Sequence, residues 1–195
     1  MRISGGGARG IPLVLPKGDL VRPATDQMRQ AVFSSLGELI VGARFVDLFA
    51  GSGAYGLEAL SRGAAGGIFV EKNAKAVACV RQNLAAVCKS LGRGEQGFTV
   101  TQADALTWHG AGANGAVPDL IFVDPPYDLI KEHAPVLFEY FTTLTVAKPE
   151  ALVLFETPGE VTLTPAGWEC FKRLGKGNRQ PTVGFYRRIP AAVAG

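Results

Sequence analysis

The stretch RFVDLFAGSGAYG, residues 44–56, decides the fold class of this chain. It reads as a short apolar strand, a glycine turn and the start of a helix. Gly51, Gly53 and Gly56 spell G-x-G-x-x-G, in which glycines allow close backbone approach of a ligand and the helix start supplies unpaired N–H groups. This layout is typical of a nucleotide site in an α/β protein.

Asp47 distinguishes between the ligands that use such a turn. The glycine pattern alone fits NAD or FAD, so an NAD-dependent oxidoreductase is one alternative. A carboxylate beside the turn would repel a pyrophosphate, but it suits the cationic amino and sulfonium end of S-adenosylmethionine. The charge favours S-adenosylmethionine as the cofactor, and we expect its first contacts at Asp47, Phe49, Gly51 and Gly53.

Acidic residues also follow three later apolar runs. Glu71 ends the run Gly67–Glu71, 24 residues beyond Asp47, as expected for a ribose-binding carboxylate. Asp104 follows the run Gly97–Thr101 and is placed to accept from an adenine amino group. Because parallel strands end at one edge of a sheet, we expect these acids to line one binding edge. The further predicted cofactor-binding residues there are Glu71, Lys72, Asp104, Ala105 and Asp124.

The corner Asp124-Pro125-Pro126-Tyr127 follows the apolar run Leu120–Val123. Two prolines have no N–H and fix φ, so the Asp124 carboxylate and the nearby carbonyls are presented as rigid acceptors. Such a corner suits an amino group, and the Tyr127 ring can stack on a planar base. We therefore predict Asp124, Pro125 and Tyr127 as the catalytic residues.

The alternation of strands and helices predicts one α/β domain over residues 1–195 with a doubly wound, mostly parallel sheet. Continuous apolar runs such as Ile121–Val123 are typical of parallel strands buried on both faces. The expected helices lie near Ala54–Ser61, Ala74–Cys88 and Leu129–Leu144, and a further strand lies at Ala151–Glu156. Trp168–Leu174 and Thr182–Arg187 are expected to close the sheet as an antiparallel hairpin.

The composition excludes several classes of protein. With 47% apolar and 19% charged residues, the chain is expected to be globular and, in the absence of an apolar run of about 20 residues or a signal peptide, cytoplasmic. The three cysteines lack C-x-x-C spacing and the two histidines are not clustered with other ligands. We therefore predict no metal site and no membrane association.

Basic residues are concentrated at the two ends of the chain. Residues 1–30 hold five basic and two acidic residues, and residues 169–189 hold six basic and one acidic residue, while the chain as a whole carries +3. We interpret residues 1–30 as an RNA-docking arm on a cofactor-binding and catalytic core of residues 31–195. The predicted RNA-binding residues are Arg2, Arg9, Arg22, Thr25, Arg29, Lys172, Arg173 and Arg179.

Ordered motifs along nearly the whole chain resemble the RsmD-like 16S ribosomal RNA guanine-N2 methyltransferases. The resemblance rests on residues 1–10 and 22–33, on Asp47–Gly53 with Gly56–Gly63, on Val70–Asn73 with Gln82–Leu84, and on Phe122–Tyr127. It implies a class I, Rossmann-like methyltransferase fold, S-adenosylmethionine as cofactor, and methylation of one guanine N2 in 16S ribosomal RNA or the assembling small subunit.

The chain departs from the family pattern at Ala24, at Tyr55 and in the link 174–181. These departures concern docking of the substrate more than binding of the cofactor. Two further alternatives stay open: an amino methyltransferase acting on adenine N6 of DNA or RNA, because the corner recognises an amino group rather than a ring, and a non-catalytic RNA-binding assembly protein. We expect a monomer.

Overall fold

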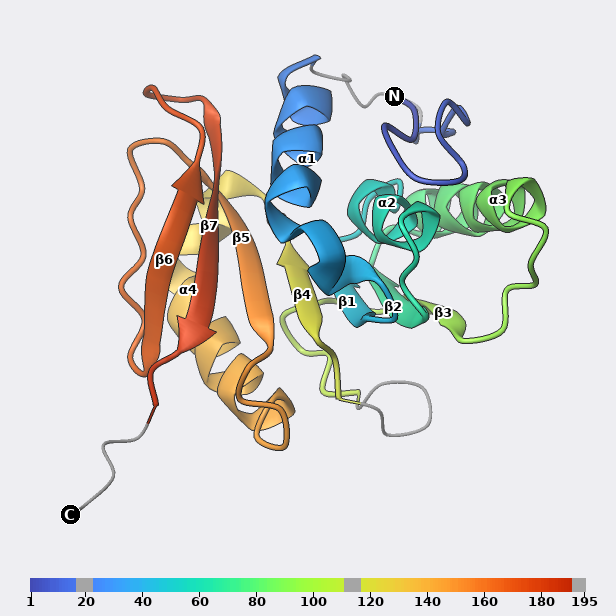
Figure 1. Ribbon diagram of the computed structural model, residues 1–195. Coiled ribbons are helices and arrows are strands. Elements are labelled where there is room, and N and C mark those ends of the chain that lie inside the picture. The colour runs from blue at the N-terminus through green and yellow to red at the C-terminus, as the bar shows by residue number, and fades with distance from the viewer. Residues whose placement is uncertain (17–22, 111–116, 191–195) are drawn as a thin grey trace.

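The computed structural model describes residues 1–16, 23–110 and 117–190, and it describes no side chain for residues 23–25 (Figure 1). Arg22 and the side chain of Thr25, both predicted to bind RNA, therefore lie outside the described part. The strands are β1 (Arg44–Leu48), β2 (Gly66–Glu71), β3 (Phe98–Gln102), β4 (Leu120–Val123), β5 (Leu152–Pro158), β6 (Trp168–Leu174) and β7 (Pro181–Arg188). The helices are α1 (Pro23–Leu36), the short 3-10 helix η1 (Gly37–Ile40), α2 (Ala54–Ser61), α3 (Ala74–Ser90) and α4 (Tyr127–Leu144).

The described strands form one seven-stranded sheet in the order β3-β2-β1-β4-β5-β7-β6. Strands β1 to β5 pair in parallel, and β7 pairs antiparallel with both β5 and β6. The predicted doubly wound sheet with a C-terminal hairpin is confirmed. The strand order reverses between β1 and β4, and in open α/β sheets ligands bind at the carboxyl ends of the strands beside such a reversal.

Two apolar layers cover the two faces of the sheet. Helices α1, α2 and α3 pack on one face, where Phe33, Phe45 and Phe122 belong to one core cluster. Helix α4 covers the other face, where Phe138 stacks on Phe155 of β5 with ring centroids 5.7 Å apart. In Figure 1, α4 lies behind β5, β6 and β7, and α1 and α2 lie on the near side. The central strands β1, β4 and β5 are therefore buried on both faces, and their carboxyl ends are the place for a binding site.

Residues 1–16 fold onto the α1–α3 face. The side chains of Ile3, Ala8 and Leu13 are buried, and Ala8 N donates to Ser61 Oγ at 3.0 Å. Helix α1 begins at Pro23 and continues to Leu36, so it crosses the boundary predicted at residue 30. The division into an arm and a core stays a prediction, but the described residues of the first 30 are packed parts of the domain.

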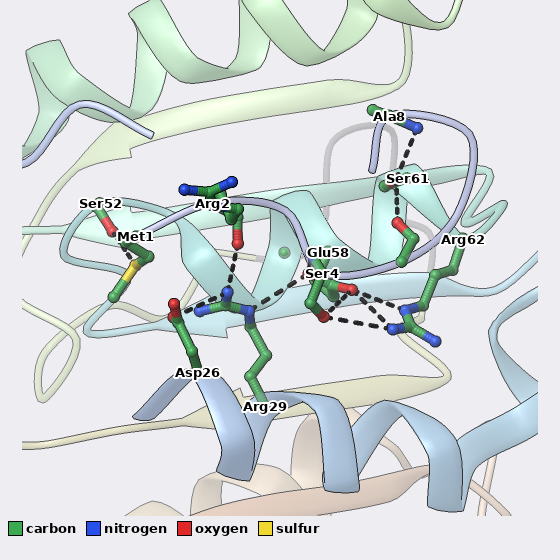
Figure 2. Close-up of polar contacts among 12 residues, drawn as sticks. Met1, Arg2, Ser4, Ala8, Asp26, Arg29, Ser52, Glu58, Ser61 and Arg62 are labelled. Carbon is green, nitrogen blue, oxygen red and sulfur yellow. Dashed lines mark hydrogen bonds and ion pairs between the residues drawn. The ribbon is translucent and has the colours of Figure 1, made fainter. Parts of the chain in front are cut away.

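A buried charge cluster attaches this N-terminal segment to α2 (Figure 2). Glu58 is fully buried, and Arg29, 2% exposed, approaches it at 3.3 Å while donating to the carbonyl of Arg2 at 2.6 Å. The backbone N–H of Ser4 and the guanidinium of Arg62 also donate to Glu58, each at 2.8 Å. Because removal of one partner would leave a buried charge uncompensated, the cluster is expected to hold the segment firmly, with a cost of about 3–5 kcal/mol if it is broken.

Within the described residues, no helix combines the length and the apolar character that crossing a membrane requires.

Candidate functional site

The turn between β1 and α2 is shaped by two glycines and one carboxylate. Gly53 has φ +81°, a left-handed conformation that favours glycine. Gly56 leaves no space for a Cβ, which would collide with the rings of Phe45 and Phe69. Asp47 Oδ2 accepts from the Gly56 N–H at 2.9 Å, so the end of β1 is tied to the first turn of α2. The third glycine of the G-x-G-x-x-G pattern thus serves close helix–sheet packing.

Glu71, at the end of β2, holds the same turn from the other side. Its Oε2 accepts from the Gly51 N–H at 2.9 Å, and its Oε1 accepts from the Asn73 N–H at 2.7 Å. Each carboxylate oxygen can accept a second hydrogen bond. Glu71 is therefore fixed in position and still has acceptor capacity for the hydroxyl groups of a ribose.

The loop after β3 carries the remaining predicted cofactor contacts. Asp104 Oδ1 accepts from the Leu106 N–H at 3.0 Å, and Lys72 lies 3.9 Å from Asp104 Oδ2. Ala105 is buried against the α4-side core. Phe49, which follows β1, has φ +59°, a conformation that is rare for a residue with a Cβ. Apart from Asp124, which follows β4, the predicted cofactor residues thus lie at or near the carboxyl ends of β1, β2 and β3.

The environment of Asp47 fits a cationic ligand. Its side chain is 2% exposed, and burial raises the pKa to about 8, with a smaller contribution from the negative charge of Glu71 and an opposing one from the Gly56 hydrogen bond. A positive group beside Asp47 would offset the cost of ionising it. The residues at the β1 and β2 ends therefore fit the amino and sulfonium groups and the ribose of S-adenosylmethionine.

The second part of the site lies at the end of β4, beside β1. Register pairs Leu48 with Val123, so Asp124 follows β4 next to the glycine turn. Asp124 is exposed on one side, yet the surrounding protein excludes water from most of its carboxyl group, and this desolvation raises its pKa well above the usual range. The negative charges of Glu156 and Asp47 raise the pKa further. Pro125 is buried, and Tyr127, 38% exposed, begins α4. The predicted catalytic corner is therefore adjacent to the predicted cofactor turn.

Glu156, which the sequence analysis does not single out, belongs to this corner. It lies on β5, one residue beyond the register pair Val123 and Phe155, and is only 6% exposed. Its two oxygens accept from the hydroxyls of Tyr55 and Tyr127, each at 3.3 Å. In the sequence, Glu156 ends an apolar run and has no motif around it; the signal that could have revealed it is the same strand-end position that revealed Asp47 and Asp124.

Comparison with known proteins identifies the family. The model of the family described as conserved hypothetical protein 95 matches residues 1–185. Ribosomal RNA small subunit methyltransferase D of Escherichia coli K12 is 35% identical over 176 residues, which is 88% of this chain and 83% of that protein. This chain belongs to the RsmD family.

A second relative and a solved structure agree with this assignment. The putative rRNA methyltransferase YlbH of Bacillus subtilis is 38% identical over 65% of this chain and 67% of its own length. The structure of the putative methyltransferase yhhF from Escherichia coli superposes with a TM-score of 0.70 and 34% identity, covering 96% of this chain and 97% of that one. The resemblance inferred from the sequence is confirmed, the protein is a methyltransferase, and the oxidoreductase and non-catalytic alternatives are set aside.

Within the described residues, the basic side chains predicted to bind RNA fall into two groups. Arg2, Arg9, Lys172 and Arg179 have exposed side chains. Arg29 is buried in the cluster with Glu58, and Arg173 donates to Thr157, Thr182 and the carbonyl of Val161, the last at 2.7 Å. The guanidinium groups of Arg29 and Arg173 therefore stabilise the fold. RNA contact remains predicted for the four exposed side chains.

Proposed function

We propose that this protein transfers a methyl group from S-adenosylmethionine to the exocyclic N2 amino group of one guanine in 16S ribosomal RNA. The observation that carries the proposal is the adjacency of Asp124, which directly follows β4, to the buried Asp47 on β1. This adjacency puts a corner suited to an amino group beside a turn suited to a cationic cofactor. The naming of the Escherichia coli relative as a small-subunit ribosomal RNA methyltransferase supports the choice of RNA.

The cofactor would be held by the three strand ends of the first half of the sheet. Asp47 faces its cationic end, Glu71 accepts from its ribose, and Asp104 accepts from its adenine amino group. Bound S-adenosylmethionine supplies an activated methyl group, so the protein needs little acid or base power. Its main task is to hold the amino nitrogen in line with that methyl group.

Asp124 and Pro125 orient the amino group of the base. The lone pair of such a nitrogen is delocalised into the ring, and hydrogen bonds from its N–H groups to the Asp124 carboxylate and the Pro125 carbonyl localise the pair toward the methyl group. The proton that becomes acidic after transfer passes to the Asp124 carboxylate or to water. The partly exposed ring of Tyr127 stacks on the extruded base.

The exposed basic side chains dock the RNA backbone around this corner. Arg2 and Arg9 lie in the N-terminal segment, and Lys172 and Arg179 lie in and after β6. Contacts of this kind fix orientation without reading sequence. The protein would act on 16S RNA or on the assembling small subunit. It would do so as a monomer in the cytoplasm, where ribosomal RNA is found.

The deciding experiment measures transfer of labelled methyl from S-adenosylmethionine to unmethylated small subunits, naked 16S RNA and duplex DNA in parallel. We expect label on guanine N2 of ribosomal RNA. Asp124→Ala is expected to lower turnover by about 1,000-fold, because alignment supplies much of the rate, while cofactor affinity stays within about threefold. Label on adenine N6 or on DNA alone would overturn the ribosomal guanine assignment, and a large loss of cofactor affinity would place Asp124 in the cofactor site.

A further inference from the structure

Glu156 is a buried acid that the methyl-transfer scheme above does not use. It is next to Asp124 on the neighbouring strand, because β4 and β5 are in register at Val123 and Phe155. Glu156 lies on β5 two residues beyond Leu154 and therefore points to the same face of the sheet, toward α1 and α2. The backbones of Asp124 and Glu156 are thus about one strand spacing, roughly 4.8 Å, apart, and the two acids are close enough for the charge of Glu156 to raise the pKa of Asp124.

The partners of Glu156 leave its charge without a cation. Each oxygen accepts from one tyrosine hydroxyl at 3.3 Å, a long hydrogen bond. Among the described residues, no ion pair includes Glu156. A nearly buried carboxylate served only by neutral donors is costly, and each of its oxygens can accept again. This is the state expected of an acceptor that is completed by a ligand with N–H donors.

We propose that Glu156 reads the N1–H of the target guanine and thereby selects guanine over bases that carry an acceptor at N1. The proposal rests on the proposed function, since it takes Asp124 as the acceptor for the amino group. Guanine presents N1–H next to its N2 amino group, so two neighbouring donors would meet two neighbouring carboxylates. Adenine and 2-aminopurine present an amino group and an unprotonated N1, whose lone pair would face the carboxylate. Flipped bases are read through this edge.

The protonation of the corner depends on which base is bound. Burial raises the pKa of Glu156, and hydrogen bonds from Tyr55 and Tyr127 lower it. Donors from a bound guanine would lower it further by favouring the ionised form. A base with an acceptor at N1 would instead require one of the two acids to be protonated.

The test compares guanine with 2-aminopurine, which keeps the 2-amino group and lacks the N1–H. After the methylated position has been mapped on the wild-type product, small subunits are reconstituted with 16S RNA carrying either base at that position. Wild-type protein is expected to prefer guanine by at least about 100-fold in kcat/KM. Glu156→Gln, whose amide can donate to an unprotonated N1, is expected to lower this preference to below about tenfold, mainly through loss on guanine.

Tyr55→Phe is the matched control, because it removes one hydroxyl from Glu156 and keeps the carboxylate. It is expected to retain the wild-type preference, and the S-adenosylmethionine affinity of both variants is expected to stay within about threefold of wild type. The proposal would be overturned if Glu156→Gln kept the preference for guanine over 2-aminopurine, or if Tyr55→Phe lost that preference to the same extent. Glu156 would then serve only to position the two tyrosines. Failure of the proposed function is seen separately, as absence of label on guanine with the wild-type protein.

Discussion

The two halves of the sheet use carboxylates in different ways. In the first half, Asp47 and Glu71 accept from the backbone N–H groups of Gly56 and Gly51, each at 2.9 Å. In the second half, Glu156 accepts from two tyrosine hydroxyls, and the raised pKa of Asp124 comes from desolvation and from the nearby charges of Glu156 and Asp47. Acids that bind the backbone define a loop, whereas acids that face side chains and each other remain available to a substrate.

This difference explains how one strand-end pattern can build two adjoining sites. The acids of β1 and β2 fix the glycine turn before any ligand arrives, so the cofactor would meet a preformed pocket wall. Asp124, which follows β4, and Glu156 on β5 repel each other when both are ionised, which makes the corner sensitive to donors brought by the base. The comparison predicts that substitutions in the two halves separate binding of the cofactor from turnover.

In the first half of the sheet, the largest effect is expected for Asp47→Asn. The amide keeps an oxygen for the Gly56 N–H but loses the charge that faces the cationic cofactor, so S-adenosylmethionine affinity should fall about 100-fold, the worth of a charge-assisted hydrogen bond. At saturating cofactor the turnover number should stay within about threefold of wild type. Titration calorimetry and initial rates measure the two quantities.

Folding provides the control for Asp47→Asn. The folded-state pKa of Asp47 is raised from 3.8 to about 8, so between about pH 4 and pH 8 the unfolded chain gives up this proton while the folded protein keeps it, at a cost in stability that grows with pH. The asparagine variant does not bear that cost, and its thermal stability relative to wild type should increase across this range. If Asp47→Asn lost turnover but kept its affinity for S-adenosylmethionine, the assignment of cofactor binding to the first half of the sheet and of turnover to the second half would be wrong.

Much of the cofactor half could be predicted from the sequence, because its acids follow clear apolar runs and its glycines stand at a fixed spacing. The helices predicted at Ala54–Ser61 and Ala74–Cys88 match α2 and α3 within two residues. Helix α1 was not predicted, since the basic residues around it read as a docking arm. Its apolar side chains Val32, Phe33 and Leu36 are buried by the sheet and α2, a tertiary effect that local pattern does not reveal.

The substrate half was predicted only in part. The corner at Asp124 is visible in the sequence because two prolines follow it, but Glu156 and Asp124 are 32 residues apart and meet only through the pairing of β4 with β5. The roles of Arg29 and Arg173 were also hidden. A charged residue gives no local sign of whether its partners are solvent or, as here, buried acids and carbonyls from distant segments.

A smaller effect is expected of pH on the binding of S-adenosylmethionine in the first half of the sheet. Because the pKa of Asp47 is raised to about 8, the acid is mostly protonated at neutral pH, and binding of a cation must release that proton. The dissociation constant of S-adenosylmethionine should therefore fall as the pH rises toward 8, by up to about tenfold per unit, and level off above it. Calorimetry at pH 6 to 9 measures this slope, and Asp47→Asn should abolish it; the same slope in the variant would assign the proton to another group.

The smallest effect should come from Lys172, whose neighbour Arg173 offers a matched control on the same strand. Lys172 is exposed, with its ammonium 5.8 Å from the centre of the Phe185 ring, while Arg173 donates to the carbonyls of Pro158, Gly159 and Val161. Lys172→Ala should raise KM for ribosomal RNA about threefold and reduce the salt dependence of binding by about one charge, without a change in melting temperature. Arg173→Ala should do the reverse, lowering the melting temperature because partly buried carbonyls lose their donor, with the salt dependence unchanged. A loss of salt dependence in Arg173→Ala would mean that its guanidinium leaves these partners for phosphate, and the distinction between structural and docking charges in the second half of the sheet would then be wrong.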